Sequence, residues 1–294
     1  MEFRHLRYFV AVAEEGGFTR AAARLHMAQP PLSTQIRRLE ALLGVELFDR
    51  SRRAIRLTGA GHALLPEARG LLAERERAIA LVRRVGGGEV GRLAVGFIPS
   101  ASNSALPPIL RAYGRDFPDV ELELRELSPD ALVAGLHDRR LDVAFFYRPL
   151  RDEALEQRVV AREPLVASLP AGHPLAAGDT VDVADLAGEP FVLPARHELP
   201  GLHAQVVGLC REHGFVPRAA QDEVWLVQTL IGLVAAGVGV ALLPASTEQL
   251  HRAGVEYRPL HPATRELELI AAWRHEPASP VLAGFLATLA PADA

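Results

Sequence analysis

Apolar and polar positions in the first part of the chain recur at the spacing of helices. Apolar residues fall at i, i+3, i+4 and i+7 from Leu6 to Ala13 and predict an amphipathic helix over residues 3–14. Thr19 is a good N-cap and predicts a second, short helix over residues 20–25. A third helix is expected from Pro30 and Pro31 onward, because a proline in the first turn loses no hydrogen bond.

The third predicted helix has two faces of different chemistry. Its buried stripe is expected to be Leu32, Ile36, Leu39 and Leu43, and its polar stripe Gln29, Ser33, Arg37 and Glu40. Two helices joined by a tight turn, the second presenting Gln, Ser, Thr34 and Arg, are typical of a helix-turn-helix. Such side chains can bond to base edges in the major groove. The alternative is an ordinary three-helix packing with a solvated polar face.

A basic hairpin is predicted directly after this helix. Residues 45–48 and 54–57 are short extended runs, and the segment between them carries Arg50, Arg52 and Arg53. Arginines on a hairpin beside a recognition helix can hold phosphates or enter the minor groove. The pattern therefore predicts a winged helix-turn-helix.

A long helix is expected next. Thr58 can cap it, and it runs to about residue 85, which gives a length of about 42 Å. Its roughly heptad-like apolar stripe predicts a dimerisation seam, the alternative being a helix packed on its own domain. Residues 86–91 match G-x-G-x-x-G, but they follow a helix and precede a strand, so we interpret them as a flexible hinge and not as a dinucleotide site.

Strands and helices alternate in the remaining two hundred residues. Strands are predicted at 93–98, 120–127, 141–146, 165–169, 191–193, 238–243 and 267–272, and helices at 102–117, 129–137, 201–213, 224–236 and 280–289. The pattern is that of an α/β body with two sheets and two lobes, with chain crossings near 162–164 and 264–267.

Charge separates the same two parts of the chain. The formal net charge is -4, but residues 1–90 carry +5 and residues 91–294 carry -9. This asymmetry favours a nucleic-acid-binding end joined to an acidic body. All 32 residues of the combined Lys and Arg count are Arg, and the chain has no Lys, so Schiff-base and lysine-base chemistry are excluded.

Several functional classes lack their sequence signatures. We find no G-x-S-x-G, no H-E-x-x-H and no cluster of metal ligands, so no catalytic residue, metal or cofactor is expected and the chain is not expected to be an enzyme. One cysteine, Cys210, excludes an internal disulfide, and we interpret it as a buried small hydrophobe and not as a redox sensor. No signal peptide precedes the first helix and the longest apolar run, 230–243, is too short to span a bilayer, so we expect a cytoplasmic protein without a membrane partner.

A specific resemblance supports this interpretation. The segment A-A-x-x-L-x-x-x-Q-P-P-L-S, then Q-I-R-R-L-E-x-x-L-G-V-x-L-F-x-R, then L-T-x-A-G is similar to the DNA-binding region of LysR-type transcriptional regulators. The resemblance implies a winged helix-turn-helix domain that is mainly α-helical over residues 1–58 and a linker/dimerisation helix over 59–87. It also implies an effector-binding domain like the type 2 periplasmic binding proteins over 91–294. Its first lobe would hold 91–162 and 267–294, and its second lobe 163–266.

Partners follow from the same resemblance. They are double-stranded DNA with a two-fold operator, a second chain paired through the linker helix, a homotetramer and RNA polymerase. Two positions depart from the family: Ala28 replaces the usual Ser or Thr cap, and Thr34 stands where Arg is common. The predicted DNA-binding residues are Thr19, Gln29, Pro30, Ser33, Thr34, Arg37, Arg50, Arg52 and Arg53.

Within the family, the chain is most similar to the muconate- and benzoate-responsive regulators of aromatic catabolism. This implies a small anionic effector between the lobes, which would close the cleft and shift them. Ser100 and Ser128 stand at helix starts where backbone N–H groups can bind an anion, although Ser128 could equally serve as a helix cap. The family's cleft arginine falls near Arg148, with Tyr147 in the direct register, and Leu202 stands where an aromatic residue is common. The alternatives are an effector of an unrelated metabolite class and, in another class, a transport binding protein.

Overall fold

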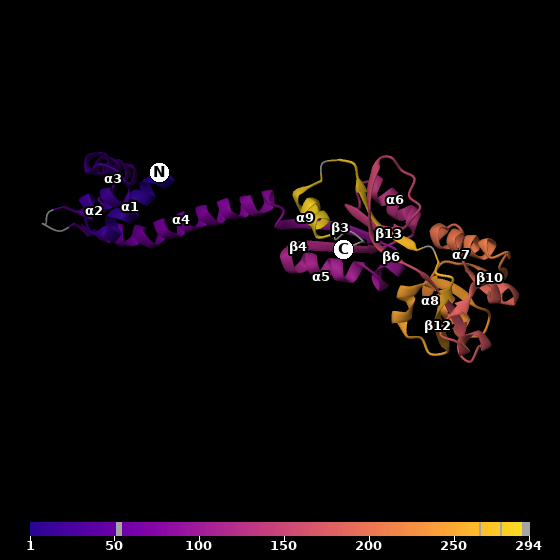
Figure 1. Cartoon of the computed structure of the whole chain (residues 1–294). Helices are drawn as coiled ribbons and strands as arrows, with labels where there is room; N and C mark the ends of the chain where they lie inside the picture. Colours follow the sequence, from indigo (N-terminus) through magenta and orange to yellow (C-terminus); the bar gives the residue numbers. More distant parts are fainter. Residues whose placement is uncertain (51–54, 265, 277, 290–294) are drawn as a thin grey trace. The chain divides into compact units, whose positions relative to one another are not determined.

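The computed structural model describes residues 1–50, 55–264, 266–276 and 278–289 (Figure 1). The chain divides into two compact units, Met1–Arg84 and Val85–Ala294. Each unit has a hydrophobic core of its own. Within the described residues, no helix is both long and apolar enough to cross a membrane.

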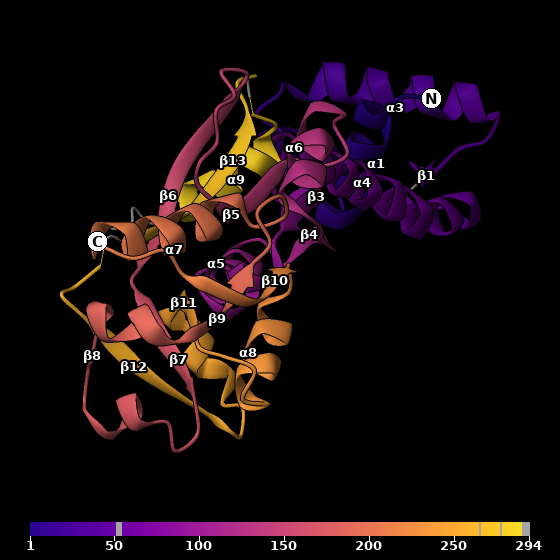
Figure 2. The ribbon, with the colours of Figure 1, turned by 90° about the vertical axis from the view of Figure 1, so that its right-hand side faces the viewer.

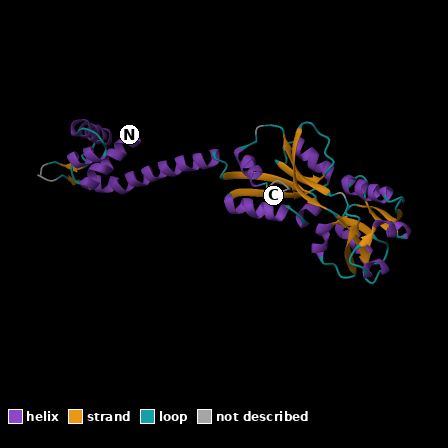
Figure 3. Ribbon diagram, in the orientation of Figure 1, coloured by secondary structure: helices purple, strands orange, loops and turns teal. Residues whose placement is uncertain are grey.

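The first unit contains helices and one small hairpin (Figure 3). Its elements are α1 (Phe3–Glu15), α2 (Phe18–Arg24), α3 (Gln29–Leu43), β1 (Phe48–Asp49), β2 (Arg56–Leu57) and α4 (Gly59–Gly86). β1 and β2 pair antiparallel, so the predicted order of three helices, hairpin and long helix is confirmed.

Local details of the first unit differ from the sequence predictions. α2 begins at Phe18 with Gly17 as its N-cap, so Thr19 lies inside the first turn and the capping prediction was wrong. Leu43 is 39% exposed because it lies in the last turn of α3, beyond the reach of the core. Val45 is exposed and lies outside the hairpin strands. The expected loss of a side-chain cap at Ala28 is confirmed.

The hairpin is anchored to the helices through aromatic packing. Phe48, in β1, lies 5.4 Å from the ring of Phe9 and 5.9 Å from the ring of Phe18, measured between centroids. Gly61, in the first turn of α4, comes so close to Leu47 that a Cβ would lie 2.3 Å from its carbonyl oxygen. The hairpin base, α1, α2 and the start of α4 therefore share one core.

The long helix α4 begins at the expected cap and changes character along its length. The Thr58 hydroxyl accepts a hydrogen bond from the Gly61 amide at 3.1 Å and donates one to the Glu46 carbonyl at 2.7 Å. Ala68 is fully buried in the core of the first unit, whereas Leu81 and Val82, farther along, are 51% and 71% exposed. Only the first half of the helix therefore packs on its own unit.

The glycine segment after α4 is held in place at one position. Gly88 has φ +75°, and a Cβ there would lie 2.5 Å from the backbone of Pro280. Because Gly88 is buried against Pro280, the expectation of a flexible hinge is corrected at this residue. The glycines lead into β3 (Val90–Phe97), so the rejection of a dinucleotide motif is confirmed.

The second unit contains a five-stranded and a four-stranded sheet, in agreement with the two predicted sheets, and a further pair of strands; Figure 2 shows them in a view turned from that of Figure 1. We call the five-stranded sheet and the helices around it the first lobe. Its strands, in spatial order, are β4 (Asp119–Glu126), β3, β5 (Val143–Tyr147), β13 (Leu267–Arg274) and β6 (Leu155–Glu163). Its helices are η1 (Pro99–Asn103), α5 (Leu106–Asp116), α6 (Pro129–His137) and α9 (Pro280–Thr288).

We call the remaining elements of this unit the second lobe. They are β7 (Leu165–Pro170), η2 (Pro174–Ala177), β8 (Val181–Asp182), η3 (Val183–Gly188), β9 (Pro190–Pro194), α7 (Pro200–Glu212), β10 (Arg218–Val224), α8 (Val227–Ala235), β11 (Ala241–Pro244), η4 (Ala245–Leu250) and β12 (Val255–His261). Four strands form a sheet in the order β11-β7-β12-β8, and a bridge between Phe191 and Val240 joins it to the β9–β10 pair. The chain passes between the lobes after β6 and returns after β12.

Four strands of the second unit were not predicted. β6, β8, β10 and β12 are short or carry many polar residues, and β6, β8 and β10 lie at sheet edges. An edge strand has one partner and a solvated side, so its sequence need not alternate cleanly. The single helix predicted over 102–117 is instead the turn η1 followed by α5.

Candidate DNA-binding surface and effector pocket

The polar face of α3 is the part of the first unit most suited to DNA. Gln29, Pro30, Thr34 and Arg37 are exposed, and Ser33 is half-buried. The Thr34 hydroxyl donates to the Pro30 carbonyl at 3.1 Å, so its proton is engaged inside the helix. Arg37 makes no ion pair or hydrogen bond with the described residues, and its guanidinium can therefore meet an external anion.

Glu40 joins α3 to the base of the hairpin. One carboxylate oxygen accepts hydrogen bonds from the amides of Leu47 at 3.0 Å and Phe48 at 3.3 Å, and the other pairs with Arg50 at 2.7 Å. The Arg50 guanidinium also lies 5.6 Å from the ring centroid of Phe18. The sequence predicted Glu40 on the polar stripe of α3. In the structure, its carboxylate attaches the base of the hairpin to this helix.

The predicted basic hairpin residues divide into two groups. Arg50 is held by Glu40, so any contact that it makes with DNA competes with this ion pair. Arg52 and Arg53 lie outside the described residues. Thr19 is exposed near the start of α2.

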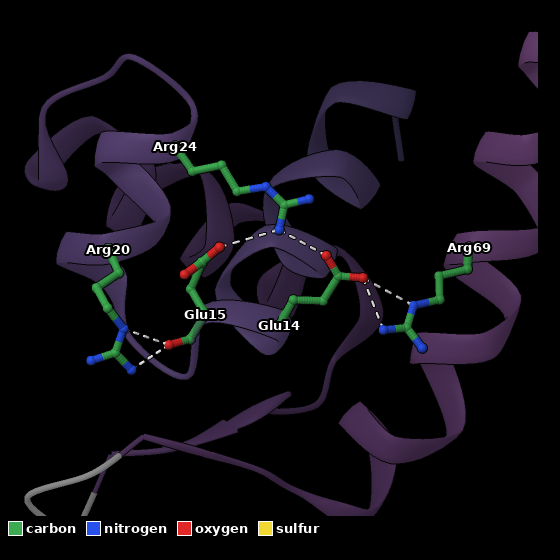
Figure 4. A network of polar contacts seen from close by, with 5 residues as sticks. All are labelled: Glu14, Glu15, Arg20, Arg24 and Arg69. Carbon is green, nitrogen blue, oxygen red and sulfur yellow. Dashed lines mark hydrogen bonds and ion pairs between the residues drawn. The ribbon is translucent and has the colours of Figure 1, made fainter.

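Three further arginines serve the fold of the first unit (Figure 4). Arg24 pairs with Glu14 at 2.8 Å and with Glu15 at 3.3 Å, and Arg69 of α4 pairs with Glu14 at 2.8 Å. Arg20 donates to the carbonyl of Glu15. Hydrogen bonds from Arg24 and Arg69 lower the pKa of Glu14. Part of the positive charge counted from the sequence therefore ties α1, α2 and α4 together.

A small pocket lies where the two lobes of the second unit meet. Its lining residues are Ile98, Pro129, Tyr147, Leu199, Pro200, Gly201 and Leu202. The space between them is about the size of one water molecule. Gly201 presses against the first lobe, since a Cβ there would lie 2.1 Å from the Arg148 carbonyl oxygen.

Two of the five predicted effector residues are among the described residues that line this pocket. Tyr147 and Leu202 line it. Ser100 is buried in η1, and Ser128 precedes α6. The Ser128 side chain makes no capping hydrogen bond, so the structure does not use this hydroxyl as a cap.

Arg148 is engaged on the surface of the first lobe. It pairs with Glu268 at 2.6 Å and donates to Gln157 at 3.2 Å, and its side chain is 43% exposed. The described residues that line the pocket include no basic side chain. At this junction, the tyrosine faces the pocket and the arginine is bound elsewhere.

Two residues that sequence reasoning did not single out lie behind Tyr147. Glu163, the last residue of β6, is only 7% exposed. It accepts a hydrogen bond from the Tyr147 hydroxyl at 2.7 Å and one from the Ser246 amide at 2.9 Å. Nothing in the sequence distinguishes Glu163 from surface glutamates, because its partners are far away along the chain.

The cysteine and the metal-ligating side chains of the described residues offer no evident reactive site. Burial raises the pKa of the Cys210 thiol to about 11, which disfavours the thiolate needed for redox sensing. Among the described residues, no cluster of His, Cys, Asp or Glu has the arrangement of a metal site.

Comparison with known families gives a match over both units. The profile described as "Bacterial regulatory helix-turn-helix protein, lysR family" matches residues 3–62, and "LysR substrate binding domain" matches residues 86–294. The chain is 40% identical to the HTH-type transcriptional regulator CatR of Pseudomonas putida, over 99% of each chain. It is 38% identical to AlsR of Bacillus subtilis, over 97% of this chain and 94% of that protein.

Solved structures agree. The chain is similar to the crystal structure of CbnR, a LysR family transcriptional regulator, with a TM-score of 0.90, 33% identity and coverage of 99% and 100% of the two chains. It also resembles full-length CbnR complexed with its target DNA, with a TM-score of 0.83, 32% identity and coverage of 98% of each chain.

Proposed function

The chain belongs to the LysR family of DNA-binding transcriptional regulators, and we propose that a small anionic metabolite bound between its two lobes switches it. The observation that carries the effector proposal is the pocket at the junction of the lobes, lined by Tyr147 and Leu202. Ser100 and Ser128 would supply hydroxyls beside the N–H groups at two helix starts. Tyr147, and not Arg148, would be the polar contact from β5.

For DNA, we assign base and phosphate contacts to the exposed face of α3 and to the hairpin. Gln29, Ser33 and Arg37 would face the major groove, and Arg50, Arg52 and Arg53 the backbone or minor groove. Footprinting on the chain's own upstream region tests this assignment. Replacing Arg52 and Arg53 together by Ala should weaken binding and reduce its salt dependence, and an unchanged salt slope would refute the hairpin assignment.

The effector class is tested by thermal shift. We expect muconate, benzoate or a related small carboxylate to raise the unfolding temperature of the full chain, because a ligand that binds only the folded state stabilises it. No shift with any of these acids would remove the aromatic-catabolism proposal. The absence of a basic side chain among the described lining residues favours a second candidate, an effector of an unrelated metabolite class.

Assembly is proposed to run through α4. Leu81 and Val82 are exposed on this helix, as a dimer seam requires, and the dimers would pair into a tetramer whose shape and DNA bend respond to the effector. Such a regulator would act in the cytoplasm and could contact RNA polymerase. Val82→Asp should shift sedimentation toward smaller species. An unchanged sedimentation profile would exclude this part of the seam.

A further inference from the structure

The junction between the lobes contains a buried carboxylate with two neutral donors. Glu163 pairs with no cation among the described residues, and its two oxygens accept from the Tyr147 hydroxyl and the Ser246 amide. Burial and the nearby Glu163 charge raise the pKa of Tyr147 well above its ordinary value, so this hydroxyl stays protonated and donates. Hydrogen bonds to a charged acceptor in a buried site are among the stronger ones in proteins.

These three residues come from different parts of the second unit. Tyr147 ends β5 and lines the pocket, whereas Glu163 ends β6 directly before the chain crosses to the second lobe. Ser246 lies in η4 of the second lobe, which packs against η1 of the first. A single carboxylate thus connects the pocket wall, the crossing strand and an element of the opposite lobe.

The small volume of the pocket means that ligand entry can disturb the hydrogen bond between Tyr147 and Glu163. A ligand of several non-hydrogen atoms needs more room than one water, so a wall must move when it enters. The other lining residues are apolar or glycine, and Tyr147 is the lining side chain whose position is fixed by a hydrogen bond to a charged group. Movement of Tyr147 therefore acts on Glu163.

We propose that Glu163 is a positioning residue that transmits displacement of Tyr147 to η4, and so couples occupancy of the pocket to the relative position of the lobes. When Tyr147 moves away, the buried carboxylate loses one of its two donors and shifts, which weakens its bond to the Ser246 amide. The coupling itself is a property of the protein alone. Its role in the effector response rests on the function proposed above.

Hydrogen exchange of the Ser246 amide in the full-length protein tests the coupling without a ligand. Glu163→Gln should accelerate this exchange about tenfold, because a neutral acceptor bonds more weakly than a carboxylate. Tyr147→Phe should also accelerate it, although the Tyr147 hydroxyl donates to Glu163 and the amide donates to the other oxygen of the same carboxylate. In the Glu163→Gln background, Tyr147→Phe should have little further effect, because its influence passes through Glu163.

Tyr113→Phe is the matched control. Tyr113 is buried in the same unit, and its hydroxyl donates to the Val281 carbonyl at 3.3 Å, so its loss reports general destabilisation. This control should leave Ser246 exchange unchanged. The proposal is overturned if Tyr147→Phe leaves the exchange at the wild-type rate, or if its effect adds in full to that of Glu163→Gln. Failure of benzoate and muconate in the thermal-shift experiment would remove the effector class and leave the exchange result standing.

Discussion

The two proposed binding regions of this regulator, the α3 face and the pocket between the lobes, are built in opposite ways. The α3 face is exposed and polar, and the proposed contacts with the major groove, from Gln29, Ser33 and Arg37, lie within fifteen consecutive residues. The pocket lies between two lobes and is mostly apolar, and its lining comes from four separate segments between Ile98 and Leu202. DNA presents a large charged surface that a protruding helix can reach, whereas a small molecule must be surrounded. A surface site can therefore be built locally, and an enclosing site cannot.

The largest predicted effect separates the two regions through Glu40. Glu40→Ala should destabilise the first unit by about 2–4 kcal/mol, since it leaves the Leu47 and Phe48 amides without their acceptor and the partly exposed Arg50 without its ion-pair partner. DNA affinity should fall with it. Calorimetry and fluorescence anisotropy on operator DNA would measure both.

The control for Glu40 is Glu46→Ala, an exposed glutamate of the same unit whose backbone carbonyl, and not its side chain, bonds to Thr58. Equal losses of stability and DNA affinity in the two variants would show that the Glu40 side chain does not attach the hairpin to α3. A large drop in the stability of the second unit would break the separation of the two regions.

A substitution at Gly201 should destabilise the second unit, as the substitution of Glu40 should destabilise the first. Gly201→Ala should cost about 3 kcal/mol, because the new methyl group meets the Arg148 carbonyl oxygen. Gly208→Ala, on the same helix with open space at the Cβ position, should be neutral or slightly stabilising. Thermal unfolding of the second unit distinguishes them. Similar melting temperatures for both variants would mean that the lobes do not press together at Gly201.

A substitution at Arg37 tests whether the α3 face contacts bases or phosphates. Arg37→Ala should weaken operator binding by about 1–3 kcal/mol if the guanidinium reads a base, or lower the salt slope by about 1 if it meets a phosphate. Stability should stay near that of the wild type, since Arg37 has no partner among the described residues. Arg38→Ala, which removes a neighbouring arginine in a hollow with Glu2 and Arg4, should affect binding less.

The smallest predicted effect concerns the ion pairs of Glu14. Its pKa is lowered in the folded state from an ordinary value near 4.5, so its stabilisation is present above that pH and is lost as the pH falls through the folded pKa. These pairs are partly exposed, and Glu14→Gln should cost only about 0.2–1 kcal/mol at pH 7. The melting temperatures of variant and wild type should converge as the pH falls below the folded pKa of Glu14. A difference that persists in acid would contradict the assignment.

Local patterns predicted the helices of the first unit because the core side of each helix repeats within a few residues. The prediction failed at ends, where Gly17 and not Thr19 caps α2 and where Leu43 lies beyond the core. The residue at which a helix begins or ends depends on contacts with residues that are distant along the chain, and a short sequence window does not contain them. The edge strands β6 and β10 were missed because most of their residues are exposed or half-buried and show no regular apolar alternation.

The sequence by itself determined the family, the order of elements and the polar face of α3, because these depend on residues that are close along the chain. Only the tertiary structure decided that Glu40 fastens the hairpin, that Arg148 pairs with Glu268 while Tyr147 lines the pocket, and that Glu163 joins Tyr147 to Ser246. The physical reason is distance. A buried polar group must find its partner in space, and 83 residues separate Glu163 from the amide that it holds.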